Sequence, residues 1–269
     1  MATANPSSPD KNSVPPRRVV LLGASNLTRG VSTVLETAFA CWGRPLQVFA
    51  ALGHGRSYGM TSRVLIRTLP GIAQCGLWRD LEASPPVPTA ALLTDIGNDL
   101  LYETPVARIA DWIEQSLDRL QAHDAAIVLT LLPTCNLDRL SNLRFRFFRQ
   151  LFMPGCGLSL AEVRHRSHEL NERLLSLADS RNVTAVAQRP DWYGMDPIHI
   201  KSRRWNDAWP EILGAWRHDT AAPPVTRAPL FRWAYLRSLP PEQRWLLRRE
   251  QRKQQPAGKL RDGSTIGFY

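Results

Sequence analysis

The sequence predicts an α/β fold in which a mostly parallel sheet is covered by helices. Five short, nearly continuous apolar runs are spread along the chain, and such runs are typical of strands that are buried on both faces of a sheet. Amphipathic segments with helical spacing lie between them, and this alternation favours a parallel sheet with helices on its faces. The composition agrees, because 43% hydrophobic and 22% charged residues are ordinary for a globular protein.

Individual elements follow from these patterns. The five expected strands cover residues 18–22, 46–52, 90–94, 125–131 and 183–187. The expected helices cover residues 27–41, 58–69, 106–121 and 160–179. Ser159 and Glu162 have the spacing of a capping box at the start of the last helix. Residues 137–158 form a basic, aromatic insertion, residues 241–254 are expected to be helical, and an Asp-Gly pair predicts a hairpin over residues 260–266.

The chain divides into a central domain with two flanking segments. Residues 1–17 are polar and rich in Pro and Ser, so we expect a disordered lead and not a secretory signal. Residues 18–217 hold the alternating pattern and form the expected domain. Residues 218–269 form a basic C-terminal extension that begins with a linker over residues 221–224. Charged tails are commonly only solvated, so we do not expect this extension to bind nucleic acid or an anionic membrane, although its charge permits it.

Several classes of protein are disfavoured. No apolar run approaches the roughly 18 residues that would span a bilayer. The four cysteines, Cys41, Cys75, Cys135 and Cys156, are widely spaced without a CxxC pair, which indicates neither a disulfide framework nor a zinc site. We therefore expect a cytoplasmic protein with reduced thiols and no bound metal.

Polar and glycine-rich segments follow four of the five expected strands. They are Gly23-Ala24-Ser25-Asn26, residues 53–57 (GHGRS), residues 95–99 (DIGND) and residues 191–199 (DWYGMDPIH). Ligands of parallel sheets bind beyond the carboxyl ends of the strands, so these segments are expected to meet. The first alone has three interpretations: a phosphate cradle on helix N–H groups, a serine nucleophile or a plain helix N-cap.

Together the segments contain the groups that acyl transfer by serine requires. Such a site needs a nucleophile, a base, a group that orients the base, and donors for the developing oxyanion. Ser25 supplies the hydroxyl, His199 is the candidate base, and Asp196 precedes it by three residues. The backbone N–H groups of Ser25 and Gly55, with the side-chain amide of Asn98, are the candidate oxyanion donors.

On these residues the chain resembles the SGNH, or GDSL-type, hydrolases. Four blocks match in order and spacing: Gly23-Ala24-Ser25-Asn26 for the serine block, residues 53–57 for the glycine block, Gly97-Asn98-Asp99 for the GxND block, and Asp196-Pro197-Ile198-His199 for the DxxH block. The resemblance covers residues 18–217. It implies a three-layer, flavodoxin-like α/β/α sandwich with a mostly parallel five-stranded sheet, a Ser25–His199–Asp196 triad, and neither a metal nor an organic cofactor.

Two positions depart from the family pattern. The family usually has Asp between the Gly and Ser of the first block, where this chain has Ala24. That Asp is not the acid of the family's triad, so the resemblance still implies hydrolysis. The glycine block is looser than usual, and Gly53 is an alternative oxyanion donor to Gly55.

Two rival sites deserve comparison with this one. Residues 55–59 read GRSYG, a literal GxSxG that would make Ser57 the nucleophile of an α/β-hydrolase. However, that fold places several strands before its nucleophile, and only one other is expected here. A nucleotide site is not specified either, because the first block lacks both GxGxxG and GxxxxGK[ST].

The sequence therefore predicts a serine esterase that hydrolyses a small-molecule carboxylic ester through an acyl-enzyme. Two alternatives stay open. An alcohol in place of water would make the same site an acyltransferase, and a scaffold that binds a ligand without turnover would share the motifs. The sequence does not set the acyl or alcohol specificity or the oligomeric state.

Overall fold

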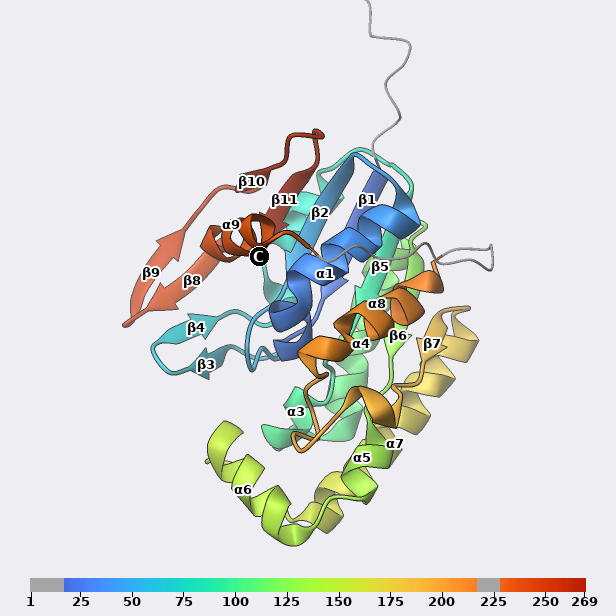
Figure 1. Ribbon diagram of the computed structural model, residues 1–269, viewed down its shortest axis with the longest axis vertical. Helices are drawn as coiled ribbons and strands as arrows, with labels where there is room; N and C mark the ends of the chain where they lie inside the picture. Colours follow the sequence, from blue (N-terminus) through green and yellow to red (C-terminus); the bar gives the residue numbers. More distant parts are fainter. Residues whose placement is uncertain (1–16, 217–227) are drawn as a thin grey trace, which may run out of the picture.

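The computed structural model of the chain describes residues 17–216 and 228–269. Its main element is a seven-stranded sheet (Figure 1) with the order β10-β11-β2-β1-β5-β6-β7. The strands are β1 (Arg17–Leu22), β2 (Leu46–Ala51), β5 (Thr89–Leu93), β6 (Ala126–Thr130), β7 (Thr184–Val186), β10 (Gly258–Lys259) and β11 (Thr265–Phe268). The lead before Arg17 and the linker over residues 221–224 lie outside the described residues.

All five expected strands are present, and they pair in parallel along the order β2-β1-β5-β6-β7. No observed bound differs from the expected one by more than one residue. Three expected helices are also confirmed, as α1 (Ser25–Trp42), α4 (Val106–Gln121) and α7 (Leu160–Ser180). The Ser159 side chain and the Glu162 carboxylate form the expected capping box at the start of α7.

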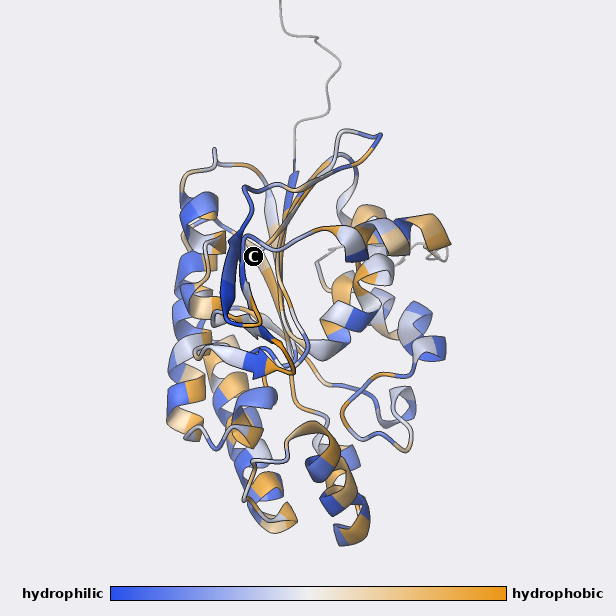
Figure 2. Ribbon diagram, turned by 90° about the vertical axis from the view of Figure 1, so that its left-hand side faces the viewer, coloured by the Kyte–Doolittle hydropathy of each residue, from blue (hydrophilic) through white to orange (hydrophobic). Residues whose placement is uncertain are grey.

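The sheet separates two hydrophobic core clusters. Val20 and Leu22 of β1 pack in a cluster with residues of α4 and α7, whereas Val19 and Leu21 pack in a cluster with α1 and α8 (Trp205–Gly214). Successive side chains of a strand point to opposite faces, and all four of these are 0% exposed. Figure 2 shows the sheet close to edge-on with helices on either side, the three layers that the resemblance implies.

A second, four-stranded sheet replaces two expected helices. It has the order β3-β4-β8-β9, and its strands are β3 (Ser62–Val64), β4 (Arg67–Leu69), β8 (Gln243–Leu246) and β9 (Arg249–Arg252). The helices expected over residues 58–69 and 241–254 were therefore wrong. The strand β4 pairs with β8, a partner far along the chain, and this pairing overrides the local helical pattern.

The C-terminal extension contributes to the main sheet. The hairpin expected over residues 260–266 is confirmed by the antiparallel β10–β11 pair, and β11 then pairs in parallel with β2. Ile266 of β11 is fully buried, the Ser264 hydroxyl accepts a hydrogen bond from the Leu46 N–H at 3.0 Å, and the Tyr269 ring stacks on Phe49. The boundary between residues 217 and 218 stays a prediction, but residues 228–269 share the core of the body.

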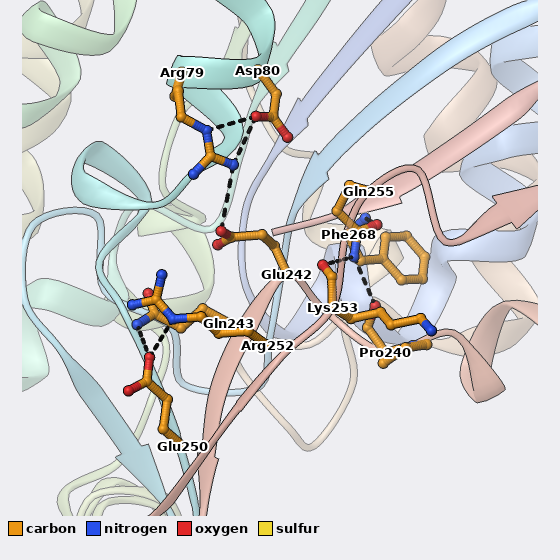
Figure 3. A network of polar contacts seen from close by, with 10 residues as sticks. All are labelled: Arg79, Asp80, Pro240, Glu242, Gln243, Glu250, Arg252, Lys253, Gln255 and Phe268. Carbon is orange, nitrogen blue, oxygen red and sulfur yellow. Dashed lines mark hydrogen bonds and ion pairs between the residues drawn. The ribbon is translucent and has the colours of Figure 1, made fainter.

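Polar contacts also attach the extension. Figure 3 shows Glu242 next to Arg79 of α2 (Leu77–Glu82), with an Arg79–Glu242 ion pair of 3.5 Å. Beside it, the Gln255 side chain accepts a hydrogen bond from the Phe268 N–H at 3.0 Å. The ion pair joins the segment before β8 to the body. The hydrogen bond joins the segment that precedes β10 to strand β11.

Three further helices lie around the carboxyl ends of the strands: α3 (Asn98–Leu101), α5 (Thr134–Asp138) and α6 (Asn142–Phe152). Helix α6 lies within the predicted basic, aromatic insertion over residues 137–158, whereas α5 mostly precedes it. Helix α6 extends from one end of the molecule (Figure 1). Among the described residues, no helix combines the length and the apolar character needed to cross a membrane.

Candidate active site

Ser25 lies where β1 turns sharply into α1. It is the first residue of that helix and is 8% exposed. Gly23 is required here, because a Cβ at this position would lie 2.7 Å from Thr94 Cγ2. Small residues thus let the chain bend beside β5. For this reason the apolar run of β1 ends at Gly23-Ala24, directly before the Ser25 hydroxyl.

Asp95 holds this turn from the neighbouring strand. Its carboxylate accepts hydrogen bonds from the N–H groups of Ala24 at 2.9 Å and Leu27 at 3.1 Å. Ala24, the N-cap residue, makes no side-chain cap of its own, so Asp95 satisfies an orphan donor in the first turn of α1, where a negative charge is favourable. Asp95 has a φ of +60°, a left-handed conformation that Asp tolerates better than most residues.

Asn26 connects the serine turn to the DxxH loop. Its amide nitrogen donates to the Asp95 carboxylate at 2.7 Å and to the carbonyl of Ile198 at 2.9 Å. Its amide oxygen accepts from the N–H of Ile200 at 2.8 Å. Ile198 and Ile200 flank His199 on both sides, so Asn26 fixes the backbone around His199 relative to its own neighbour Ser25. The roles of Asp95 and Asn26 were missed from the sequence, although both stand in the motif segments.

Asp196 and His199 form a close pair. The Nδ1 atom of His199 lies 2.6 Å from Oδ2 of Asp196, and the other Asp196 oxygen accepts from the N–H groups of Ile198 and His199. Partial burial acts to raise the pKa of Asp196, but the contacts with the His199 ring and these N–H donors outweigh it and hold the pKa below its ordinary value. Asp196 therefore stays ionised and orients the imidazole.

The described residues include no direct hydrogen bond between the Ser25 hydroxyl and the His199 ring. The two are brought to the same edge of the sheet through Asn26. Hydrogen bonds between catalytic groups are often long before substrate binds and tighten in the complex, so this geometry is compatible with a nucleophile and its base.

The candidate oxyanion donors lie on the loops after β2 and β5. Asn98 is the first residue of α3, and its Nδ2 atom is 3.5 Å from the Arg56 carbonyl, at the limit of a hydrogen bond. Gly55 has a φ of +62°, which glycine adopts without strain, and its carbonyl accepts from the Tyr102 hydroxyl at 2.5 Å. Asn98 lines the same pocket as Ser25, whereas neither Gly55 nor Gly53 is among the lining residues.

Ser57, the nucleophile of the rival GxSxG interpretation, is a structural residue. It is 0% exposed, and its hydroxyl donates to the Asp99 carboxylate while accepting from the Gly59 and Met60 N–H groups. Burial raises the pKa of Asp99 to about 6, although its hydrogen bonds oppose the change. A hydroxyl enclosed in this way has no access to a substrate.

His54 lies in the loop that follows β2. Burial lowers its pKa, and the positive charges of Arg67 and Arg237 lower it further, with a smaller contribution from His199. His54 is therefore neutral near pH 7. It does not line the pocket that contains Ser25, so its sequence position beside Gly55 does not make it a wall of that cavity.

The pocket beside Ser25 is open to solvent, and the free space within it and in front of it together amounts to about 920 Å³. Ser25, Asn26, Asn98 and Ile198 line its polar end, and nine of the other twenty lining residues belong to α3, α5, α6 and α7. Among the described residues, no group of three or more His, Cys, Asp or Glu side chains is arranged to hold a metal ion. The site as it stands offers a hydroxyl, an Asp–His pair and amide donors.

Comparisons with known proteins give the fold. No protein-family model matches the sequence, and no curated protein matches it. AlinE4, an SGNH-hydrolase family esterase, is 19% identical over 76% of this chain and 94% of its own, with a TM-score of 0.43. The native M. smegmatis aryl esterase is 14% identical over 74% of this chain and 97% of its own, with a TM-score of 0.51. Its inhibitor-bound form has a TM-score of 0.50 and 16% identity over the same shares. The aryl esterase matches show that this chain has a fold like that of the aryl esterase.

Proposed function

We propose that this protein is an SGNH-type serine hydrolase that cleaves a small-molecule carboxylic ester. The observation that carries the proposal is the 2.6 Å Asp196–His199 pair, whose loop is tied beside Ser25 by the hydrogen bonds of Asn26 to Ile198 and Ile200. The fold, which resembles that of an aryl esterase, supports the same reaction.

In the proposed mechanism, the Ser25 oxygen attacks the ester carbonyl carbon while Nε2 of His199 takes the hydroxyl proton. The Ser25 N–H, the Asn98 amide and the Gly55 N–H donate to the carbonyl oxygen as it becomes negative. The tetrahedral intermediate then expels the alcohol oxygen, which receives the proton from His199. Water, deprotonated by His199, attacks the acyl-enzyme and releases the carboxylic acid and the free Ser25 hydroxyl.

The direct test is hydrolysis of an aryl acetate by the wild-type protein and by two serine variants. Ser25→Ala should reduce turnover to the background level, because it removes the nucleophile. Ser57→Ala, the matched control on the adjacent loop, should retain more than half of kcat once its folding is verified by circular dichroism. Activity that survives Ser25→Ala would contradict the proposal.

A further inference from the structure

The pocket beside Ser25 has an apolar interior. Its lining beyond the polar end is dominated by leucine and phenylalanine side chains, several of which belong to a separate hydrophobic cluster built by the insertion and the start of α7. Leu137, Leu140, Phe145 and Val163 are members of both, and each is less than 8% exposed. A cavity with such walls stabilises a ligand by removing apolar surface from water.

The two charged side chains of the lining already have partners. Asp95 accepts the hydrogen bonds of the serine turn. Arg149 of α6 donates to the Leu158 carbonyl at 2.9 Å, and its guanidinium lies over the Phe145 ring. Asp95 is thus fully engaged, whereas Arg149 keeps its positive charge, and the remaining, mostly apolar lining favours a hydrocarbon-like group.

The inner face of α6 forms one wall. Phe148 and Phe152 both line the pocket and stack at a centroid distance of 5.9 Å, and the Phe152 ring meets the His199 ring edge-on at 5.3 Å. An aromatic surface thus runs from the triad histidine into the insertion. By contrast, Phe147 on the same helix is 63% exposed and does not line the pocket.

The covalent step indicates which half of an ester the pocket takes. Ser25 and Asn98 line the pocket. The acyl group stays bonded to the Ser25 oxygen after the first step, whereas the alcohol departs once it has taken its proton from His199. The acyl group is therefore the half that is held beside the pocket.

We infer that the substrate is an ester with an extended, uncharged aliphatic acyl chain, which lies along the inner face of α6. This inference rests on the proposed hydrolase function and adds its substrate class. Each buried methylene is worth a factor of about four. Binding that is equal in the ground and transition states lowers KM without changing kcat, so longer chains should act mainly through KM.

The test uses p-nitrophenyl esters from acetate to decanoate, kept below their micelle concentrations. We expect kcat/KM to rise by about fourfold per methylene until the chain fills the pocket. Phe148→Ala should lower kcat/KM for the octanoate about tenfold more than kcat/KM for the acetate, equivalent to one or two methylenes returned to water. Phe147→Ala, the exposed neighbour, should leave both values within twofold.

Two further outcomes separate the substrate class from the hydrolase function. Ser25-dependent hydrolysis with a flat chain-length series would overturn the acyl pocket and leave the esterase intact, and preference for octyl acetate over the octanoate would overturn the acyl orientation. Calorimetric titration of Ser25→Ala with p-nitrophenyl decanoate requires no turnover. If the ester binds and Phe148→Ala weakens its affinity, the result supports the pocket even without hydrolysis. If the ester does not bind, the result contradicts the pocket.

Discussion

Asn26→Ala should uncouple the serine turn from the DxxH loop. The substitution removes three hydrogen bonds, to Asp95, Ile198 and Ile200, from a side chain that is 6% exposed. At about 1 kcal/mol net for each bond, the free energy of unfolding should fall by about 3 kcal/mol. The displaced His199 should lower kcat on an aryl acetate by about 10²-fold, because a shift of about 1 Å at a catalytic group has this cost, while KM changes little.

A matched control separates positioning from general loss of stability. Gln121 ends α4 at the opposite edge of the sheet, and its amide exchanges hydrogen bonds with Arg181 at 2.9 and 3.1 Å. Gln121→Ala should lower the free energy of unfolding, measured in urea, by about 1–2 kcal/mol and leave kcat unchanged. If Asn26→Ala loses stability but retains kcat within twofold, Asn26 does not position the triad and the reasoning is refuted.

Three other variants test separate parts of the account. Asn98→Ala should lower kcat about 10²–10³-fold with little change in KM, the usual loss for one oxyanion donor; an unchanged kcat would remove Asn98 from the mechanism. Because burial raises the pKa of Asp99 from 3.8 to about 6, the stabilisation from this group is complete below about pH 4 and is lost as the pH rises through about 6. From pH 4 to pH 7, the free energy of urea unfolding of the wild-type protein should therefore fall by about 2 kcal/mol more than that of Asp99→Asn, and parallel losses would contradict this. Ile266→Ala should cost about 2–5 kcal/mol in the same assay, whereas a cost below about 0.5 kcal/mol would mean that β11 is not part of the cooperative core.

The five parallel strands could be predicted because each is an apolar run buried on both faces. The local pattern alone specifies such strands, and the position of Ser25 after β1 follows from it. The four motif segments meet because parallel strands place their carboxyl ends at one edge. The Asp196–His199 contact was also accessible, since a spacing of three residues lets the two side chains face each other within one turn of chain.

The second sheet could not be read from the sequence, because its strands are defined by distant partners. Gly59 disfavours the expected helix over residues 58–69 on propensity, but the reason for a glycine there is tertiary, because a Cβ would lie 1.8 Å from the Trp112 ring. The turn between β8 and β9 has Leu247 and Arg248 at φ values of 49° and 66°. Hairpin turns of this type are usually signalled by Asn or Gly, and neither residue stands at these positions.

The supporting residues of the site were hidden for a related reason. Asp95 acts on α1 from another strand, so its capping role appears only when β1 and β5 are placed side by side. Ala24, which departs from the family pattern, needs no carboxylate of its own because Asp95 supplies one to its N–H. The amide of Asn26 likewise reaches a loop some 170 residues away along the chain.

The most direct test of the central claim is the location of a fluorophosphonate adduct by mass spectrometry of the intact, folded protein. We expect one adduct on Ser25, lost in Ser25→Ala, lost or strongly slowed in His199→Ala, and retained in Ser57→Ala. An adduct on Ser57, or a protein that reacts at no serine while its fold is intact, would contradict it.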